Sequence, residues 1–201
     1  MDSSYSVLST ALTFFLVTNP IGNSPAIVAL IKDYDLSRQK KIMLREAFIS
    51  LALALFFQYF GEFFLTHLHV QDYAVTLCGG ILLFLVALNM IFALSQPAEM
   101  ATMKQEPFIV PIATPLLSGP GLLTIIMLYA REVDNNLKIS AAILLAWVGV
   151  TLVLVVAPYL QKILGKRGLI ALEQLMGMIL SMIAMEMIVK GFTLFFHAMN
   201  S

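Results

Sequence analysis

The stretch that decides the fold reads Asn19-Pro20-Ile21-Gly22-Asn23-Ser24-Pro25, and it interrupts an otherwise apolar run, Tyr5–Ile31. Proline has no amide hydrogen and clashes with the carbonyl four residues earlier, so it kinks or ends a helix. Asparagine or serine directly before a proline makes a favourable helix start. We therefore predict two half-helices here, with the second beginning inside the apolar run.

A second apolar run, Phe108–Ala130, carries a similar interruption. It contains Pro115 and the run Ser118-Gly119-Pro120-Gly121, and Pro120 follows Pro20 by 100 residues. Lipid offers no partner to backbone groups freed at such breaks, so they must be buried in protein or line a wet cavity.

The start of each second half-helix is predicted to bind an anion. Unpaired N–H groups and the positive end of the helix dipole gather there, and a carboxylate suits such a place. We expect the two starts to converge on one spot. The predicted binding residues are Asn19, Pro20, Gly22, Asn23, Thr114, Ser118, Gly119 and Gly121.

The composition is that of a membrane protein. Hydrophobic residues make up 60% of the chain and charged residues only 12%, against about 25% charged in soluble domains. The net charge of +0 argues against a nucleic-acid partner. Six runs are long enough to cross a bilayer as helices. They are Tyr5–Ile31, Met43–Leu65, Tyr73–Leu94, Phe108–Ala130, Ile139–Leu160 and Leu169–Phe196. We predict an all-α membrane protein with six transmembrane helices in a single domain, residues 1–201.

Lysine and arginine residues are concentrated in alternate joints. Nine lie in the joints after the first, third and fifth segments: Lys32, Arg38, Lys40, Lys41, Arg45, Lys104, Lys162, Lys166 and Arg167. The opposite side has three: Arg131, Lys138 and Lys190. Because the basic side faces the cytoplasm, we expect both termini outside.

The third and sixth segments resemble each other. Gly80 is followed by Ala87-Leu88-Asn89-Met90-Ile91, and Gly177 by Ala184-Met185-Glu186-Met187-Ile188, an offset of 97 throughout. Each half thus begins with a broken segment. Because each half crosses the membrane three times, an odd number, the second half enters from the opposite face. The pattern predicts two inverted three-helix repeats, about residues 1–98 and 99–201, as in many transporters with a site near the midplane.

Two polar residues stand at corresponding positions within the predicted spans. An ionisable residue inside the bilayer is costly and is a functional-site hypothesis. Glu186 is expected to hold a substrate ammonium or a coupling proton, or alternatively to pair with Lys190 one turn later. Asn89 is its repeat counterpart. Glu46 and Glu173 lie beside basic residues and are predicted to form surface ion pairs.

The two proline-containing stretches, Asn19–Asn23 and Pro115–Gly121, resemble the MarC family of bacterial and archaeal inner-membrane proteins. Gly61-Glu62, Gly79-Gly80-Ile81-Leu82 and Glu173 with Gly177 support the match, which covers nearly the whole chain. The resemblance implies a multi-pass protein of the cytoplasmic (inner) membrane and a transporter of small neutral amino acids.

These features allow three classes of function to be compared. The first is a secondary transporter of a small zwitterion by alternating access, driven by protons or sodium ions or passive. The second is a channel-like facilitator. An enzyme is not expected, because no histidine lies deep enough to activate Ser118 and Leu116 replaces the glycine of a rhomboid-like motif. Neither a cofactor nor a metal is predicted, and the sequence leaves open whether the chain forms a homo-oligomer.

Overall fold

The computed structural model describes residues 6–92, 112–133 and 135–200, and the regular secondary structure of these ranges is helical. The helices are α1 (Val7–Thr18), α2 (Pro20–Ile31), α3 (Leu36–His67), α4 (Asp72–Phe92), the short π-helix η2 (Ile112–Leu117), α5 (Pro120–Glu132) and α6 (Asn136–Asn200). The prediction of an all-α protein is therefore confirmed for the described residues.

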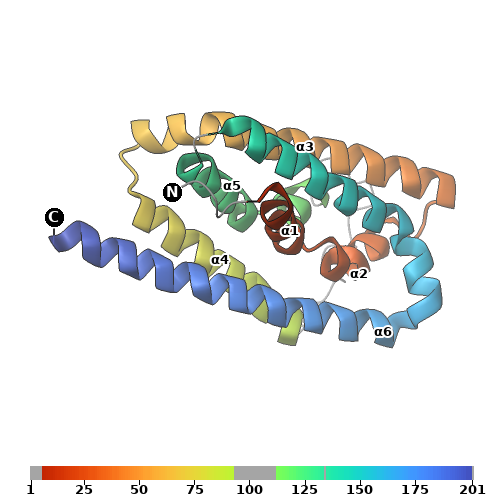
Figure 1. Ribbon diagram of the computed structural model, residues 1–201. Helices are drawn as coiled ribbons and strands as arrows, with labels where there is room; N and C mark the ends of the chain where they lie inside the picture. Colours follow the sequence, from red (N-terminus) through yellow and green to blue (C-terminus); the bar gives the residue numbers. More distant parts are fainter. Residues whose placement is uncertain (1–5, 93–111, 134, 201) are drawn as a thin grey trace.

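Helix α6 consists of two arms that meet at Gly165. This glycine has φ 64° and ψ 179°, a conformation that costs a residue without Cβ little. The first arm packs with α3 on one side of the molecule, and the second packs with α4 on the other side (Figure 1). Helices α1, α2 and α5 lie between these two pairs (Figure 1). The chain thus forms three layers, with the interrupted segments in the middle layer.

Five helical segments are long and apolar enough to cross a membrane: Val7–Ile31, Leu36–His67, Asp72–Phe92, Asn136–Tyr159 and Arg167–Met199. The remaining predicted run begins at Phe108, outside the described residues. Its described part consists of η2 and α5, which together are interrupted as expected. The sixth span therefore stays a prediction.

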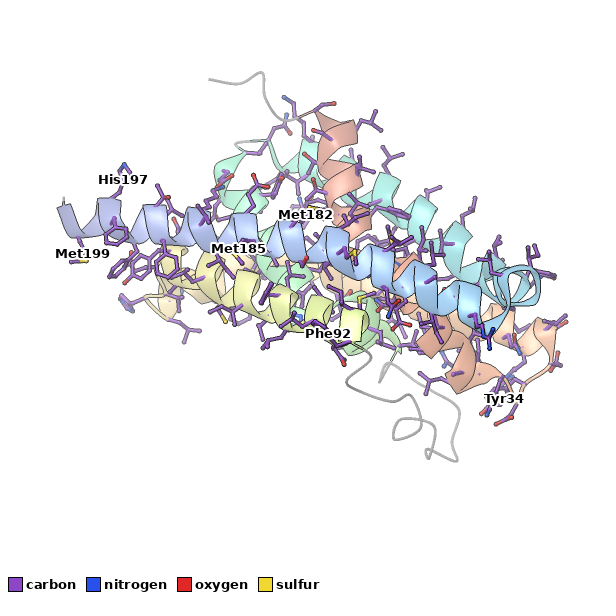
Figure 2. All side chains as sticks on the ribbon, turned by 90° about the horizontal axis from the view of Figure 1, so that it is seen from below. Tyr34, Phe92, Met182, Met185, His197 and Met199 are labelled. Carbon is purple, nitrogen blue, oxygen red and sulfur yellow. The ribbon has the colours of Figure 1, made fainter. Side chains whose placement is uncertain are left out.

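Large apolar side chains cover the outside of the two outer helix pairs. Phe48 is 71% exposed on α3, and Val148 is 66% exposed on the first arm of α6. Met182 and Met185 project from the second arm without a covering helix (Figure 2). Such a surface suits hydrocarbon, because bilayer lipid is as apolar as these side chains.

Two glycines allow α4 and the second arm of α6 to pack closely. A Cβ on Gly80 would lie 3.1 Å from the carbonyl oxygen of Ala184, and a Cβ on Gly177 would lie 3.1 Å from that of Ala87. Gly177 follows Gly80 by 97 residues, and Ala184 follows Ala87 by 97. The contact is therefore reciprocal, as a two-fold relation between the repeats requires. The full inverted repeat stays a prediction, since part of the second half is outside the described residues.

Candidate functional site

The first interruption lies at Asn19, between α1 and α2. Asn19 has φ 50° and ψ 52°, in the left-handed region that asparagine tolerates better than most residues. Its side-chain Oδ1 accepts a hydrogen bond from the N–H of Gly22 at 3.1 Å, and so caps the start of α2. Its Nδ2 lies 3.1 Å from the sulfur of Met90 on α4. Asn19 is buried, and it both breaks the span and closes the new helix start.

The side-chain amide of Asn23 joins the two interruptions. Its Nδ2 donates to the carbonyl of Thr18 at 3.1 Å and to the carbonyl of Leu116 at 2.8 Å. In an unbroken helix these carbonyls would accept from the N–H groups four residues later. The N–H of Gly22 is instead taken by Asn19, and Pro120 has none. One amide therefore satisfies one freed carbonyl from each break.

The second interruption begins at Thr114, whose backbone is extended at φ −137° and ψ 128°. It precedes Pro115, and a residue before proline is driven out of the helical region. Beyond it, the N–H of Ser118 donates to the carbonyl of Ala113 at 2.8 Å, a π-helical bond. The Ser118 hydroxyl, fully buried, donates to the carbonyl of Ser50 on α3 at 3.0 Å. Helix α3 thus supports the second break from one side.

Glu46 on α3 also supports the second break. Its Oε2 accepts from the N–H of Ala113 at 3.3 Å, and its Oε1 lies 2.9 Å from both Nε and Nη2 of Arg45. The predicted ion pair with a basic neighbour exists, but the predicted surface position is wrong, because the Glu46 side chain is 0% exposed. Sequence reasoning missed this contact because Ala113 is 67 residues away. Hereafter "the junction" means residues 18–23 and 112–121 with Glu46 and Ser50.

The start of α5 differs from the start of α2 in having no cap. Gly119 at the cap position has no side chain, and Pro120 has no N–H. Gly121 and Leu122 are buried, and their N–H groups have no hydrogen-bond acceptor among the described residues. Free N–H groups at a buried helix start need a partner, and an anion is one that suits them.

The two half-helix starts lie beside the same face of α4. A Cβ on Gly22 would lie 2.3 Å from Cε of Met90, and one on Gly121 would lie 2.5 Å from Cγ of Leu83. Met90 and Leu83 are two turns apart, about 10 Å along the helix. Both starts therefore lie along one face of α4, and the predicted convergence of the two on one spot stays a prediction.

The polar residues predicted within the third and sixth segments lie in different environments. Asn89 is half-buried on α4, next to Met90. Glu186 is exposed on the second arm of α6, and no hydrogen bond of the junction involves it. Lys190 pairs with Glu132 at the end of α5, so the alternative ion pair between Glu186 and Lys190 does not form.

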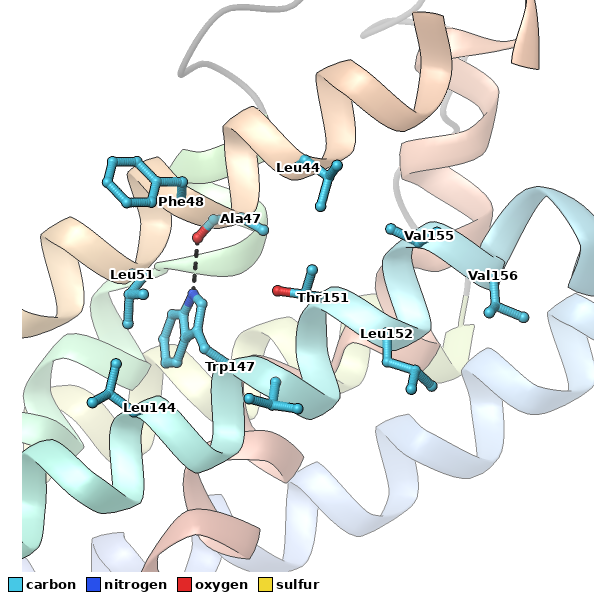
Figure 3. Close-up of a pocket in the computed structure, with 11 residues that line it drawn as sticks. Leu44, Ala47, Phe48, Leu51, Leu144, Trp147, Thr151, Leu152, Val155 and Val156 are labelled. Atoms are coloured by element: carbon cyan, nitrogen blue, oxygen red, sulfur yellow. Dashed lines mark hydrogen bonds between the residues drawn. The ribbon is translucent and has the colours of Figure 1, made fainter. Parts of the chain in front are cut away.

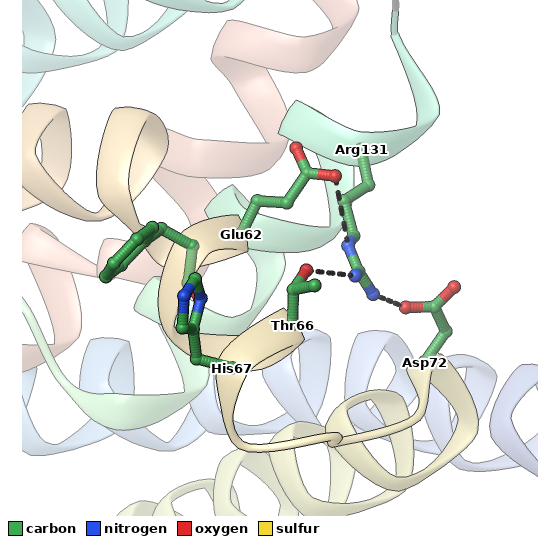
Figure 4. A network of polar contacts seen from close by, with 6 residues as sticks. Glu62, Thr66, His67, Asp72 and Arg131 are labelled. Atoms are coloured by element: carbon green, nitrogen blue, oxygen red, sulfur yellow. Dashed lines mark hydrogen bonds and ion pairs between the residues drawn. The ribbon is translucent and has the colours of Figure 1, made fainter.

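A polar network links the ends of α3 and α5 to the start of α4 (Figure 4). The turn between α3 and α4 lies at the opposite end of the bundle from the joint between α2 and α3 (Figure 1). Arg131 at the end of α5 contacts Asp72 at the start of α4, lies 3.9 Å from Glu62 and donates to the Thr66 hydroxyl at 3.5 Å. The sequence placed these residues on one side of the membrane without indicating that they meet. Because the acidic side chains are more than half exposed, the pairs contribute little stability.

The fold and the junction define a multi-pass helical membrane protein in which two interrupted segments meet inside the bundle. The pattern of the MarC family integral membrane proteins matches residues 5–196, and the chain belongs to that family.

Several curated relatives match along nearly the whole chain. It is 37% identical to the UPF0056 inner membrane protein YhgN of Escherichia coli K12, over 92% of this chain and 95% of that one. It is 34% identical to a UPF0056 membrane protein of Buchnera aphidicola subsp. Schizaphis graminum, over 94% and 97%. A UPF0056 membrane protein of Chlamydia pneumoniae is 31% identical over 95% and 96%. No solved structure matches.

Proposed function

We propose that this protein is a secondary transporter of a small zwitterionic solute, a neutral amino acid, that operates by alternating access at the junction. The observation that carries the proposal is the pair of interrupted segments bridged by Asn23, beside an α5 start whose N–H groups lack acceptors. Interrupted spans that meet near the midplane are the binding elements of several transporter folds.

The carboxylate of the solute would bind at the start of α5. The N–H groups of Gly121 and Leu122 have no other acceptor among the described residues, whereas the N–H of Gly22 is already bonded to Asn19. The ammonium group would meet a backbone carbonyl at the breaks. Thr114, whose backbone is extended at the second break, and Ser118, which lies just before the start of α5, would set the orientation of the solute.

Alternating access requires two arrangements of similar energy. An inverted repeat supplies them, because each half can take the conformation of the other. The reciprocal contacts of Gly80 and Gly177 support such a relation. Glu186 is our candidate for the coupling proton, with a sodium ion as the alternative. The basic joints after the first and fifth segments lie at one end of the bundle (Figure 1), which supports an orientation in the cytoplasmic membrane with both termini outside.

The test is uptake of radiolabelled neutral amino acids into proteoliposomes that contain the purified protein. We expect saturable uptake, and its loss in Gly22→Leu, since the added side chain would collide with Met90 and Asn19. Ala52→Leu is the control, because it also introduces a leucine but on an exposed position of α3. Flux that rises linearly with concentration would favour a channel-like facilitator. Neither uptake nor binding of any neutral amino acid would overturn the proposal.

A further inference from the structure

A groove of about 650 Å³ runs between α3 and the first arm of α6 (Figure 3), and its lining contains none of the predicted binding residues. Its lining is apolar apart from Thr151. Leu44 and Phe48 contribute from α3, and Val148 and Leu152 contribute from α6. Phe48, Val148 and Leu152 are 71%, 66% and 63% exposed, so the groove is open to the outside of the bundle.

Trp147 forms a fixed part of the wall of this groove. Its Nε1 donates to the carbonyl of Ala47 at 3.1 Å and to the hydroxyl of Ser50 at 3.0 Å. The indole is 3% exposed, and its one donor is used by α3. These bonds tie the two helices together beside the groove and present only the apolar ring to an occupant. Two hydrogen bonds therefore fix this part of the groove wall.

The depth of the groove excludes water as the natural occupant. Its α3 residues lie within the span Leu36–His67, and its α6 residues lie within Asn136–Tyr159. An open apolar groove at this level faces hydrocarbon. A lipid acyl chain matches both its lining and its position.

Positive charge lies at one end of the groove. The Lys40 ammonium lies 5.5 Å from the ring centre of Tyr159. On α3, Lys40 is one turn before Leu44; on α6, Tyr159 is about one turn after Val155 and Val156, which also line the groove. The neighbouring Lys41 is exposed, so two ammonium groups stand where the headgroup of a bound lipid would lie.

Among the described residues, no carboxylate forms an ion pair with Lys40 or Lys41. Glu46 is buried and bonded to Arg45 and to the backbone of the second break. Asp35 accepts from the N–H groups of Ser37 and Arg38 at the start of α3. An anionic phosphate is therefore the complementary group. Basic residues at the cytoplasmic edge of a span recognise anionic headgroups in this way.

We propose that the groove binds one acyl chain of an anionic phospholipid, with the phosphate at Lys40 and Lys41. The site is independent of the proposed transport, because it shares no residue with the predicted solute site. It is nevertheless connected to the junction: Trp147 donates to the hydroxyl of Ser50, and the carbonyl of Ser50 accepts from Ser118.

The test is native mass spectrometry of the purified full-length protein, titrated with phosphatidylglycerol or phosphatidylcholine. We expect phosphatidylglycerol to be retained preferentially and to raise the unfolding temperature more than phosphatidylcholine does. The double variant K40Q/K41Q should lower that preference by about tenfold, since each basic residue near an anionic lipid strengthens binding severalfold.

Filling the groove tests the acyl-chain part. Val148→Trp, or Leu152→Trp if the first variant does not fold, should abolish retention of phosphatidylglycerol. Met182→Trp is the control, because Met182 is 64% exposed on the other arm of α6 and does not line the groove. Equal retention of the two lipids, or unchanged retention in the filled variant, would overturn the proposal. A dimer that dissociates on filling, without loss of lipid, would also overturn it and assign the groove to a second copy of the chain.

Discussion

The two interruptions have similar sequence signals but are stabilised in different ways. The first is closed by residues of its own stretch: Asn19 caps α2, and Asn23 binds the freed carbonyl of Thr18. The second has no polar cap of its own at the start of α5. It depends on Glu46 from α3 and on Asn23 from the first break.

In the proposed transporter, this difference indicates which break would accept the solute. A helix start that is capped by its own side chain offers little to an anion, because its donors are already used. A start that follows Gly119-Pro120 keeps its donors free. We therefore propose a structural role for the first break and assign the carboxylate of the solute to the second. Five variants at four positions test this comparison.

The largest effect is expected for Glu46→Ala. It leaves Arg45 without its buried partner and the N–H of Ala113 without an acceptor. Leaving a buried N–H unsatisfied costs about 1–3 kcal/mol, and loss of the ion pair with Arg45, whose side chain is 34% exposed, adds to that cost. We expect a large fall in the unfolding temperature in detergent. Glu62→Ala is the control, because Glu62 is 62% exposed and 3.9 Å from Arg131, and it should cost less than about 1 kcal/mol. An equal effect of the two variants would show that the second break does not depend on α3.

Asn23→Ala should have the next largest effect. It leaves the carbonyls of Thr18 and Leu116 without their shared donor. Each unsatisfied buried polar group costs about 1–3 kcal/mol, so we expect a destabilisation of about 2 kcal/mol or more together with loss of uptake. Asn135→Ala is the control. It removes only a local cap at the exposed start of α6. Unfolding temperature and uptake are measured on the same preparations. Full uptake in Asn23→Ala would show that the Asn23 bridge between the two breaks is not needed for transport.

The role of Asn19 can be divided between its backbone and its side chain. Asn19→Ala loses the cap and places an alanine at φ 50°, whereas Asn19→Gly loses the cap but tolerates this conformation. Lost caps cost about 1 kcal/mol with alanine and only a few tenths with glycine. Thermal unfolding should therefore rank the native protein, Asn19→Gly and Asn19→Ala in falling order. Equal loss in both variants would mean that the left-handed backbone is unimportant.

The smallest effect on stability is expected for Glu186→Gln. Glu186 is exposed, and the junction does not depend on it, so the unfolding temperature should not change measurably. If Glu186 carries the coupling proton, uptake should lose its dependence on pH, because glutamine cannot titrate. The measurement is initial uptake rate against external pH. A pH profile that matches the native one would remove Glu186 from the coupling mechanism.

Much of the fold follows from patterns visible in the sequence. Pro20 and Pro120 mark the two breaks, and Gly165 lies in the predicted joint at which α6 turns. These features are local, because proline and glycine change the backbone wherever they stand. The positions of the breaks relative to each other and to Glu46 are not local. They arise from contacts between residues 67 to 93 positions apart.

The sequence alone determined that the chain belongs in a membrane, that it is helical and where its helices break. These properties follow from hydropathy and from missing amide hydrogens, which act on short stretches. Only the tertiary structure decided which groups satisfy the broken backbone. In an apolar medium a freed carbonyl must find a donor, and a freed N–H must find an acceptor. The packing of the helices decides which group is near. Packing places the Asn23 amide beside the carbonyl of Leu116 and the Glu46 carboxylate beside the N–H of Ala113.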